Sequence, residues 1–399
     1  MYGLERLTYL CLKDDTHTDF HTAFATEELR ATPPTVLCSV SLSITVYTKT
    51  RNPAALVFIP ICAGRRAGMR ISMKKMLIGA FALSLAVTAS AGALAEKYNL
   101  MFSHTLTEND PYHQAFVQWA DAVSERTNGE LTIDVYANAQ LGAEEDVIEQ
   151  MRMGANIGHN TDFARLGNYV PEVAVFNGPY MLESMDDVKK AQQLDCVKEW
   201  EKRLEEEFGL KVLSFAYVQG YRNVISNKPV TKPEDLSGMK IRTAGAPIWQ
   251  ESIRAIGATP VSLARSEIYS AAQTKAIDGI EDVYTAYASA QLNEVLKVVS
   301  ETHHIYLVNV SVCSADWFNS LPEEYQQILV EEADKAGYAV SESIQENADQ
   351  VKQELIDAGV TIVPYEDIDI EAFKAAGEKA YEVMGITEAK KAVYEGLGK

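Results

Sequence analysis

The chain has 399 residues, 56 of them acidic and 36 basic, so its formal net charge at pH 7 is −20. Nucleic acids and anionic lipid surfaces repel such an acidic protein, and the composition argues against both as partners. The first 95 residues hold 10 basic and 6 acidic side chains, which leaves residues 96–399 with a net charge of −24. Against this acidic background, a cluster of inward-facing arginines is informative about function.

Residues 73–95 have the three-part pattern of a secretory signal peptide. Two lysines form a basic start, residues 76–87 form an apolar stretch, and an A-x-A cleavage site ends the segment. A membrane-spanning helix is the alternative, because the apolar run approaches the ~20 residues that a span needs. The second half of the run is mostly Ala, Ser, Thr and Gly, which favours the signal peptide. We therefore expect an exported protein.

The 72 residues ahead of this segment need a separate explanation, because a signal peptide acts from an N-terminus. We interpret residues 1–72 as a disordered segment translated from a start upstream of the true one, at Met73 or Met69; a genuine extension is the alternative. The mature chain then begins near Glu96 and is long enough for two lobes with cores. It contains Cys196 and Cys313, for which one disulfide and two separate thiols are both compatible with the sequence.

The first half of the mature chain alternates between strand and helix patterns. We predict, in chain order, a strand at 98–103, a helix at 110–129, a strand at 130–137, a helix at 143–153, a strand near 157, a helix at 186–208 and a strand at 210–218. Asp110 followed by Pro111 is typical of a helix start, because Asp caps free N–H groups and Pro fits the first turn.

The second half continues the alternation. We predict a strand at 238–243, a helix at 248–256, a strand at 259–263, a helix at 266–275 and a tight turn at 277–282. This alternation is typical of α/β lobes with mainly parallel sheets.

Residues 321–358 form one long helical pattern. Apolar side chains recur every three or four positions, Pro322 lies at the first turn and Gly359 follows the end. Such a helix would be roughly 57 Å long at 1.5 Å per residue, longer than one small lobe. We predict a single helix, straight or bent, that crosses both lobes; two helices broken near Gly337 are the alternative.

Seven motifs in order along the chain carry a family resemblance. They are ANAQLGAEEDVIEQMRMG, VPEVAVFNGPYML, GYRNVISNKPV, KPEDLSGMKIRT, IGATPVSL, SEIYSAAQTKAIDGIED and WFNSLPEEYQQIL. From Tyr98 to about Tyr394 the chain resembles the periplasmic substrate-binding proteins of tripartite ATP-independent periplasmic (TRAP) transporters, of the dicarboxylate-binding DctP type. Each motif alone is weak evidence, but the ordered set covers nearly the whole mature chain.

The resemblance implies an α/β fold of two lobes, joined by hinge strands and sharing a long helix. Lobe I would hold 96–219 and about 306–346, and lobe II would hold 220–305 and about 347–399. Members of this family do no chemistry and need no cofactor. They capture a small organic acid in the cleft between the lobes and deliver it to two integral membrane subunits.

Two arginines match the family's ligand-binding positions. Arg242, in the run KIRT, matches the arginine that pairs with the ligand carboxylate. A guanidinium suits this role because its rigid fork holds a carboxylate through two parallel hydrogen bonds. A solvated arginine at a strand end is the alternative. Arg222 matches a second arginine where the chain crosses between lobes, and a hinge salt bridge is its alternative.

Asp282 stands where many family members carry Asn. An ionised Asp only accepts hydrogen bonds, whereas Asn both donates and accepts. Facing Arg242, Asp282 could neutralise the cation, or it could receive a hydroxyl or ammonium group of the ligand. We therefore hypothesise a ligand with donors beside its carboxylate, such as a hydroxy acid, a sugar acid or an amino acid.

Five further residues are weaker candidates. Asp162 and Arg165 match positions that touch ligand in some members, with a surface ion pair as the alternative. Glu144 stands at a helix start, where its favourable interaction with the helix dipole explains it without a ligand. Thr105, after the first strand, is a ligand-binding candidate of similar strength. Arg265 departs from the apolar or aromatic residue common at its position, and it could meet a second carboxylate or point to solvent.

The sequence offers no metal or catalytic site. His303 and His304 are neighbours and face opposite sides of a strand, and the other histidines lack companions at ligand spacing. Glu281 with Asp282 is the one arrangement that could hold a cation beside the substrate. There is no nucleophile elbow, P-loop or dinucleotide-binding glycine pattern. A periplasmic enzyme and a chemosensory ligand-binding protein on the same fold are the alternatives to transport.

Overall fold

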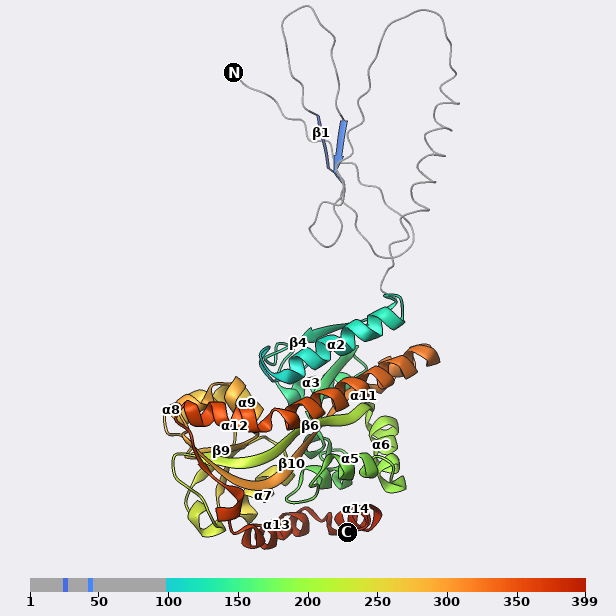
Figure 1. Cartoon of the computed structure of the whole chain (residues 1–399). Coiled ribbons are helices and arrows are strands. Elements are labelled where there is room, and N and C mark those ends of the chain that lie inside the picture. The colour runs from blue at the N-terminus through green and yellow to red at the C-terminus, as the bar shows by residue number, and fades with distance from the viewer. Residues whose placement is uncertain (1–23, 28–41, 46–97) are drawn as a thin grey trace, which may run out of the picture. The chain divides into compact units, whose positions relative to one another are not determined.

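The computed structural model describes residues 24–27, 42–45 and 98–399. The chain divides into two units, Met1–Ala91 and Gly92–Lys399. In the first unit, β1 (Phe24–Glu27) pairs antiparallel with β2 (Leu42–Thr45). The predicted signal peptide and most of residues 1–72 lie outside the described residues. Figure 1 shows the second unit in colour.

One mixed sheet runs through the second unit. Its strands are β3 (Tyr98–Ser103), β4 (Leu131–Tyr136), β5 (Ile157–Asp162), β6 (Leu210–Ser226), β7 (Lys240–Thr243), β8 (Thr259–Ser262), β9 (Gly279–Asp282), β10 (Val298–Ser314) and β11 (Thr361–Val363). Their order is β4-β3-β5-β10-β6-β9-β7-β8, with β11 beside β10. Pairing is parallel at the two ends of the sheet and antiparallel at its centre, around β6 and β10. The predicted strands are confirmed, and the parallel pairing holds only outside the centre.

Two long strands, β6 and β10, join the two halves of the sheet (Figure 1). Their pairing is irregular in the middle: the register skips Gln219, and Gly220 has a φ of 90°. β10 has a second irregularity between Ser300 and Ile305. The predicted strand at 210–218 is too short because the apolar run ends there, whereas backbone pairing continues to Ser226. These strands connect the lobes of a two-lobed fold, and bulges allow local bending.

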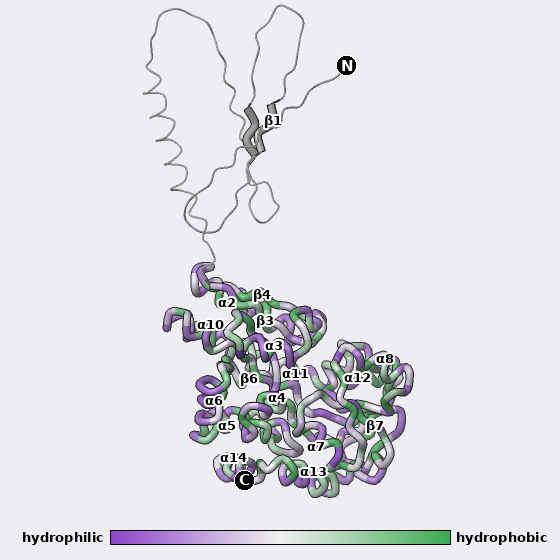
Figure 2. Tube along the Cα trace, turned by 180° about the vertical axis from the view of Figure 1, so that it is seen from behind, coloured by the Kyte–Doolittle hydropathy of each residue, from purple (hydrophilic) through white to green (hydrophobic). Residues whose placement is uncertain are grey.

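Helices cover the sheet. They are α2 (Pro111–Arg126), α3 (Glu144–Arg152), α4 (Phe163–Leu166), α5 (Met185–Ala191), α6 (Asp195–Phe208), α7 (Pro247–Ala255), α8 (Ile268–Gln273), α9 (Tyr284–Ser289), α10 (Ala315–Asn319), α11 (Glu323–Glu346), α12 (Ala348–Asp357), α13 (Ile370–Met384) and α14 (Thr387–Leu397). Asp110 caps α2 as predicted, by accepting a hydrogen bond from the N–H of Tyr112. Hydrophilic and hydrophobic residues alternate along these helices, as expected where one face covers a sheet (Figure 2).

Two predictions for shorter elements are wrong. The helix predicted at 186–208 is divided into α5 and α6, because Leu194 has extended backbone angles between them. The tight turn predicted at 277–282 is mostly strand β9, which lies between β6 and β7. A four-residue strand with two acidic residues has no alternating pattern to reveal it, and burial in the sheet centre decides its structure.

The long helix is interrupted at Asn347, so the prediction of one continuous helix is wrong at that residue. Asn347 has φ −95° and ψ 1°, ends α11 and precedes α12. Its side-chain amide donates to the carbonyl oxygen of Ser343 at 2.7 Å. Gly337, where the alternative placed a break, lies inside α11. Figure 1 shows α11 beside α2 and α12 beside α9, in agreement with their contacts.

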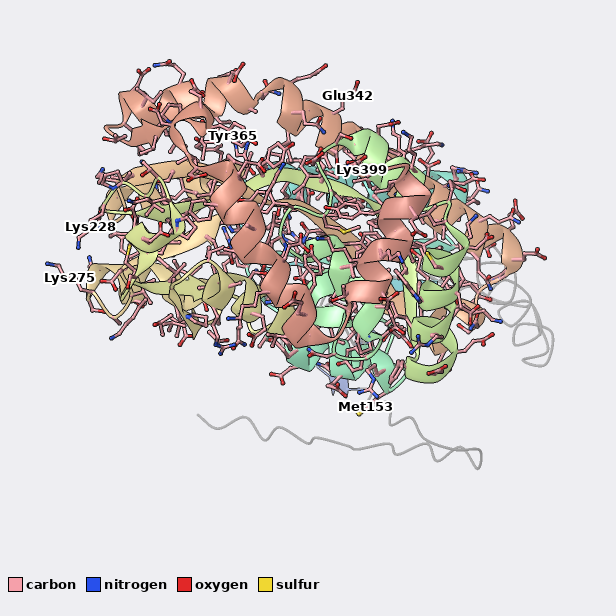
Figure 3. All side chains as sticks on the ribbon, turned by 90° about the horizontal axis from the view of Figure 1, so that it is seen from below. Met153, Lys228, Lys275, Glu342, Tyr365 and Lys399 are labelled. Carbon is pink, nitrogen blue, oxygen red and sulfur yellow. The ribbon has the colours of Figure 1, made fainter. Side chains whose placement is uncertain are left out.

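Gly337 allows α11 to pack closely on β6. A Cβ atom at this position would lie 2.9 Å from the Cβ of Ala216 and 3.0 Å from the ring of Tyr217. We expect Gly337→Ala to lower the melting temperature, because overpacking costs about 1–3 kcal/mol and exceeds the helix-propensity gain of about 1 kcal/mol. Thermal denaturation measures this effect. Glu342→Ala, at an exposed position of α11 (Figure 3), should change stability by less than about 0.5 kcal/mol; equal melting of both variants would contradict close packing.

The last two helices contact elements from distant parts of the sequence. α13 packs against α7, and α14 packs against α5 and η1 (Pro171–Asn177). Tyr381 donates to the carbonyl oxygen of Pro179 at 2.8 Å, and Tyr394 donates to that of Tyr180 at 2.7 Å. Figure 3 shows these two helices on one face of the fold. They tie the C-terminal segment to the loop after η1.

Cys196 and Cys313 are both free thiols, which settles the alternatives left by the sequence. Cys313 is buried, and its burial raises the pKa of its thiol.

Among the helices of residues 98–399, none is both long and apolar enough to cross a membrane.

Candidate functional site

All eight side chains that the sequence suggested as ligand-binding line a single cavity of about 50 Å³. These residues are Thr105, Glu144, Asp162, Arg165, Arg222, Arg242, Arg265 and Asp282. A larger cleft of about 770 Å³ adjoins this cavity, since Thr105, Glu144, Arg165 and Arg265 line both. Residues from widely separated parts of the sequence thus meet in one place.

The carboxyl ends of the parallel strands explain why they meet. Thr105 follows β3 and Asp162 ends β5, while Arg242 lies in β7 and Asp282 ends β9. Within each half, the parallel strands end at the same side, where ligands bind in open α/β folds. Because β5 and β9 are joined through three antiparallel pairings, they run in opposite directions, and the carboxyl ends of the two halves face each other. Arg222 lies on β6, the long strand that connects the two halves. The cavity therefore has one wall from each half and a base on a connecting strand.

Arg165 is surrounded by carboxylates. Its Nη2 lies 2.8 Å from Oε2 of Glu144, its Nε donates to Oε1 of Glu145 at 3.1 Å, and its Nη1 bonds closely with Asp162. Burial alone would raise the pKa of Glu144, but Arg165 and His159 outweigh it and lower this pKa to about 2. Burial also raises the pKa of Asp162, against the pull of Arg165. The surface ion pair considered from sequence is in fact a buried cluster.

Arg222 is bonded to Glu281, a residue that the sequence offered only as a cation ligand. Its Nε bonds closely with the Glu281 carboxylate, and its Nη2 donates to the Glu281 carbonyl oxygen at 2.7 Å. The other carboxylate oxygen of Glu281 accepts from the Thr243 hydroxyl at 2.7 Å. The Arg222 guanidinium also lies 4.7 Å from the ring centre of Trp249. The hinge salt bridge considered for Arg222 therefore exists, inside the cavity wall.

Asp282 pairs with Arg265 and not with Arg242. Arg265 Nη1 donates to Asp282 Oδ2 at 3.1 Å, and Arg265 Nη2 donates to the carbonyl oxygen of Ala286 at 2.8 Å. The other oxygen of Asp282 accepts from the N–H of Val283 at 2.9 Å. The suggestion that Asp282 neutralises Arg242 directly is therefore wrong, because the Arg265 side chain reaches this carboxylate.

Arg242 is a buried cation without an ion pair among residues 98–399. Its Nε and Nη2 donate to the carbonyl oxygen of Leu263 at 3.1 and 2.8 Å, and the residue is 4% exposed. Burial lowers its pKa to about 10, and the positive charges of Arg265 and Arg222 add to this effect, against the carboxylates of Glu281 and Asp282. A buried guanidinium without an ion pair binds an incoming carboxylate favourably, because the carboxylate compensates its charge through strong hydrogen bonds.

Three amide side chains in the cavity wall were not predicted. Asn160 Oδ1, Asn309 Oδ1 and Gln219 Nε2 are buried and have no hydrogen-bond partner within the described part of the chain. Asn160 lies two residues before Asp162 in β5, hence on the same strand face, and this spacing could have revealed it. Asn309 and Gln219 carry no comparable signal, because their positions depend on how β6 and β10 pair.

The acidic pair proposed as a possible cation site is already occupied by the protein's own donors. Glu281 bonds with Arg222 and Thr243, and Asp282 bonds with Arg265. Within residues 98–399 there is no group of three or more His, Cys, Asp or Glu side chains suited to holding a metal ion. His104 Nε2 and His113 Nδ1 lie 3.0 Å apart as an isolated pair.

The buried carboxylate of Glu281 should make the stability of the folded protein depend on pH. Burial alone would raise its pKa, but Arg222 and the His304 ring, whose Nε2 lies 3.8 Å from Oε2, lower it to about 2. A carboxyl group whose pKa is lower in the folded protein than in the unfolded chain stabilises the fold at pH values above its unfolded pKa, about 4.3. This stabilisation is lost as the pH falls from there toward 2. We expect the melting temperature to fall over this interval, and less steeply in Glu281→Gln. Parallel curves for the two proteins would contradict this assignment.

Comparisons with known proteins agree with the fold. The sequence model of the family described as "Bacterial extracellular solute-binding protein, family 7" (DctP) matches residues 102–388. The C4-dicarboxylate-binding periplasmic protein DctP of Rhodobacter capsulatus is 30% identical over 287 residues, which cover 71% of this chain and 85% of that protein.

Two solved structures share the architecture. One is a TRAP periplasmic solute-binding protein of Actinobacillus succinogenes with bound L-galactonate, with a TM-score of 0.71 and 28% identity. The other comes from Ochrobacterium anthropi and contains bound L-fuconate, with a TM-score of 0.72 and 28% identity. Each alignment covers 75% of this chain and 99% of the other. This chain therefore belongs to the DctP family of bacterial extracellular solute-binding proteins, the solute-binding proteins of TRAP transporters.

Proposed function

We propose that this protein captures a small organic acid in the periplasm of a Gram-negative bacterium and delivers it to the two integral membrane subunits of a TRAP transporter. The observation that carries the proposal is Arg242, a buried guanidinium without an ion pair among the described residues, in a cavity between two sets of strand ends. The predicted signal peptide at 73–95 would export the chain. Binding without catalysis is the function of the family.

The ligand carboxylate would bind to Arg242 through the part of its guanidinium that Leu263 leaves free. Arg222 would adjoin it, while Asp162, Asp282 and Glu144 would accept hydrogen bonds from ligand hydroxyl groups. Arg165 and Arg265 would hold those carboxylates in place, and Thr105 would close the cavity edge. Structural relatives with bound L-galactonate and L-fuconate support a carboxylate with several hydroxyl groups.

The lobes would close around this ligand. We assign residues 96–219 and about 306–346 to lobe I, and residues 220–305 and about 347–399 to lobe II. The irregular pairing of β6 and β10 at Gln219 and after Ser300 supports bending at these strands.

A thermal-shift screen of the exported protein against organic acids tests the function. A ligand present at about 100 times its dissociation constant stabilises a protein by ~2.7 kcal/mol. We expect at least one carboxylate to raise the melting temperature, and a flat response across the acids would overturn the proposal. Recovery of the ligand unchanged from the denatured complex would separate binding from an enzyme on the same fold.

Asp282→Asn tests the role of the acceptor opposite the carboxylate. We expect about tenfold weaker binding of the natural acid, because a hydrogen bond to a charged acceptor contributes about 1.5–3 kcal/mol. Isothermal titration measures the change. The control is Asp278→Asn, an exposed residue whose carboxylate accepts from the Lys240 N–H outside the cavity. Equal affinity in wild type and Asp282→Asn would remove Asp282 from the site.

A further inference from the structure

We propose that the cavity is electrically polarised and selects acids with one carboxylate and hydroxyl groups at the other end, against dicarboxylates of the same length. The inference rests on the proposed function, because it concerns which acid the cavity accepts. It depends on how the four arginines of the cavity wall are paired.

The positive end of the cavity is Arg242. The other three arginines already have partners: Arg222 bonds with Glu281, and Arg265 bonds with Asp282. Arg165 bonds with carboxylates on its own side of the sheet. Arg242 alone among these four donates only to a carbonyl oxygen within the described residues. The cavity therefore has one cation available for one carboxylate.

The opposite wall carries an excess of negative charge. The buried carboxylate of Asp162 and the largely buried one of Glu144, whose side chain is 13% exposed, share the single cation of Arg165, and Glu145 at the rim bonds with the same guanidinium. Glu144 and Asp162 are both on the side formed by β5 and α3, whereas Arg242 is on β7. A second ligand carboxylate at this wall would face like charges in a buried site, which is costly.

Hydroxyl groups fit this wall because each can donate to a carboxylate. Three amide atoms without a hydrogen-bond partner among the described residues, Oδ1 of Asn160, Oδ1 of Asn309 and Nε2 of Gln219, belong to side chains of the same cavity and add neutral hydrogen-bonding groups. A buried polar atom without a partner is costly until a ligand group satisfies it. Four arginines in one cavity could suggest a ligand with several anionic groups. Three of the four already pair with carboxylates of the protein, so this number is not evidence for such a ligand.

Matched acids that differ only at the terminal carbon test the proposal. Each pair compares a terminal hydroxymethyl group with a carboxylate: glycerate with tartronate, threonate with tartrate, and galactonate with galactarate. Isothermal titration with wild-type protein measures all six. We expect the tightest ligand to be a monocarboxylate that binds at least about tenfold more tightly than its dicarboxylate counterpart.

A charge variant tests the cause of the selectivity. In Glu144→Gln, the dicarboxylate should gain at least about fivefold relative to its monocarboxylate partner, because the wall loses one negative charge. The ratio of two affinities in one variant is insensitive to any change in stability. The control is Glu145→Gln: its side chain is 56% exposed and bonds with the same arginine, so solvent should screen its charge and leave the ratio nearly unchanged.

The outcomes separate this inference from the function on which it rests. A dicarboxylate as tightest ligand, or an unchanged ratio in Glu144→Gln, would overturn the polarised cavity while an organic-acid-binding function stands. If none of the six binds but a carboxylate without hydroxyl groups does, the requirement for hydroxyl groups is wrong. If no carboxylate of any kind binds, the proposed function fails as well.

Discussion

Arg242→Met should abolish ligand binding and leave the ligand-free protein as stable as wild type or more stable. Truncating one partner of a buried charge pair costs about 2–5 kcal/mol of binding free energy, a loss of about 30-fold or more. In the absence of ligand, the variant removes a buried guanidinium that has no ion pair within residues 98–399. Replacing such a charge by an apolar side chain of similar length relieves its desolvation. Isothermal titration and thermal denaturation measure the two effects.

Arg254→Ala is the control for this variant. Arg254 lies on α7, and its half-exposed side chain pairs with Glu251 outside the cavity. Both binding and stability should stay close to wild type, since exposed ion pairs contribute about 0–1 kcal/mol. Retained affinity in Arg242→Met would show that the carboxylate is held elsewhere. A lower melting temperature in Arg242→Met would show that the ligand-free protein depends on this guanidinium.

Arg165→Met should have the opposite effect on stability. Arg165 is the shared partner of Glu144 and Asp162; Asp162 is buried with it, and the Glu144 side chain is only 13% exposed. Removing one partner of a buried ionic cluster costs about 3–5 kcal/mol, because the remaining charges are uncompensated. At roughly 2–4 °C per kcal/mol for a chain of this size, the melting temperature should fall by about 6–20 °C.

The control for Arg165→Met is Arg203→Met. Arg203 also pairs with a carboxylate, Glu172 at 2.9 Å, but both side chains are about one third exposed. Water can therefore solvate Glu172 after the substitution, and the loss should be below about 1 kcal/mol. Similar melting temperatures for the two variants would show that burial of the Arg165 cluster contributes little.

Arg165 and Arg242 have the same side chain and lie in one cavity, but they are expected to affect stability in opposite ways because their partners differ. Arg165 satisfies carboxylates of the protein, and its side chain is part of the folded framework. Arg242 has no carboxylate partner within the part of the chain that the structure describes, and is left for the carboxylate of a ligand. Binding sites commonly retain such unfavourable groups, because removing them would increase stability and destroy function.

Local sequence patterns predicted most of the strands and helices correctly. The Asp110-Pro111 pair marked the start of α2, and alternating residues marked β4. The patterns were misleading where tertiary contacts decide local structure. The short strand β9 is buried at the sheet centre, and the interruption at Asn347 lies where α11 gives way to α12. Neither feature has a periodicity of its own.

Motifs and strand-end positions are local features of the chain, so they were enough to predict the α/β class, the family and eight of the residues that line the cavity. The pairing of the charges follows from the folded arrangement and has no local signal in the sequence. Arg265 lies 17 residues before Asp282 and Arg222 lies 59 residues before Glu281, yet both pairs are in contact. Ion pairing depends on distances of a few ångströms between distant segments. The folded sheet therefore decides that Arg242, among the four arginines of the cavity, has no carboxylate partner within residues 98–399.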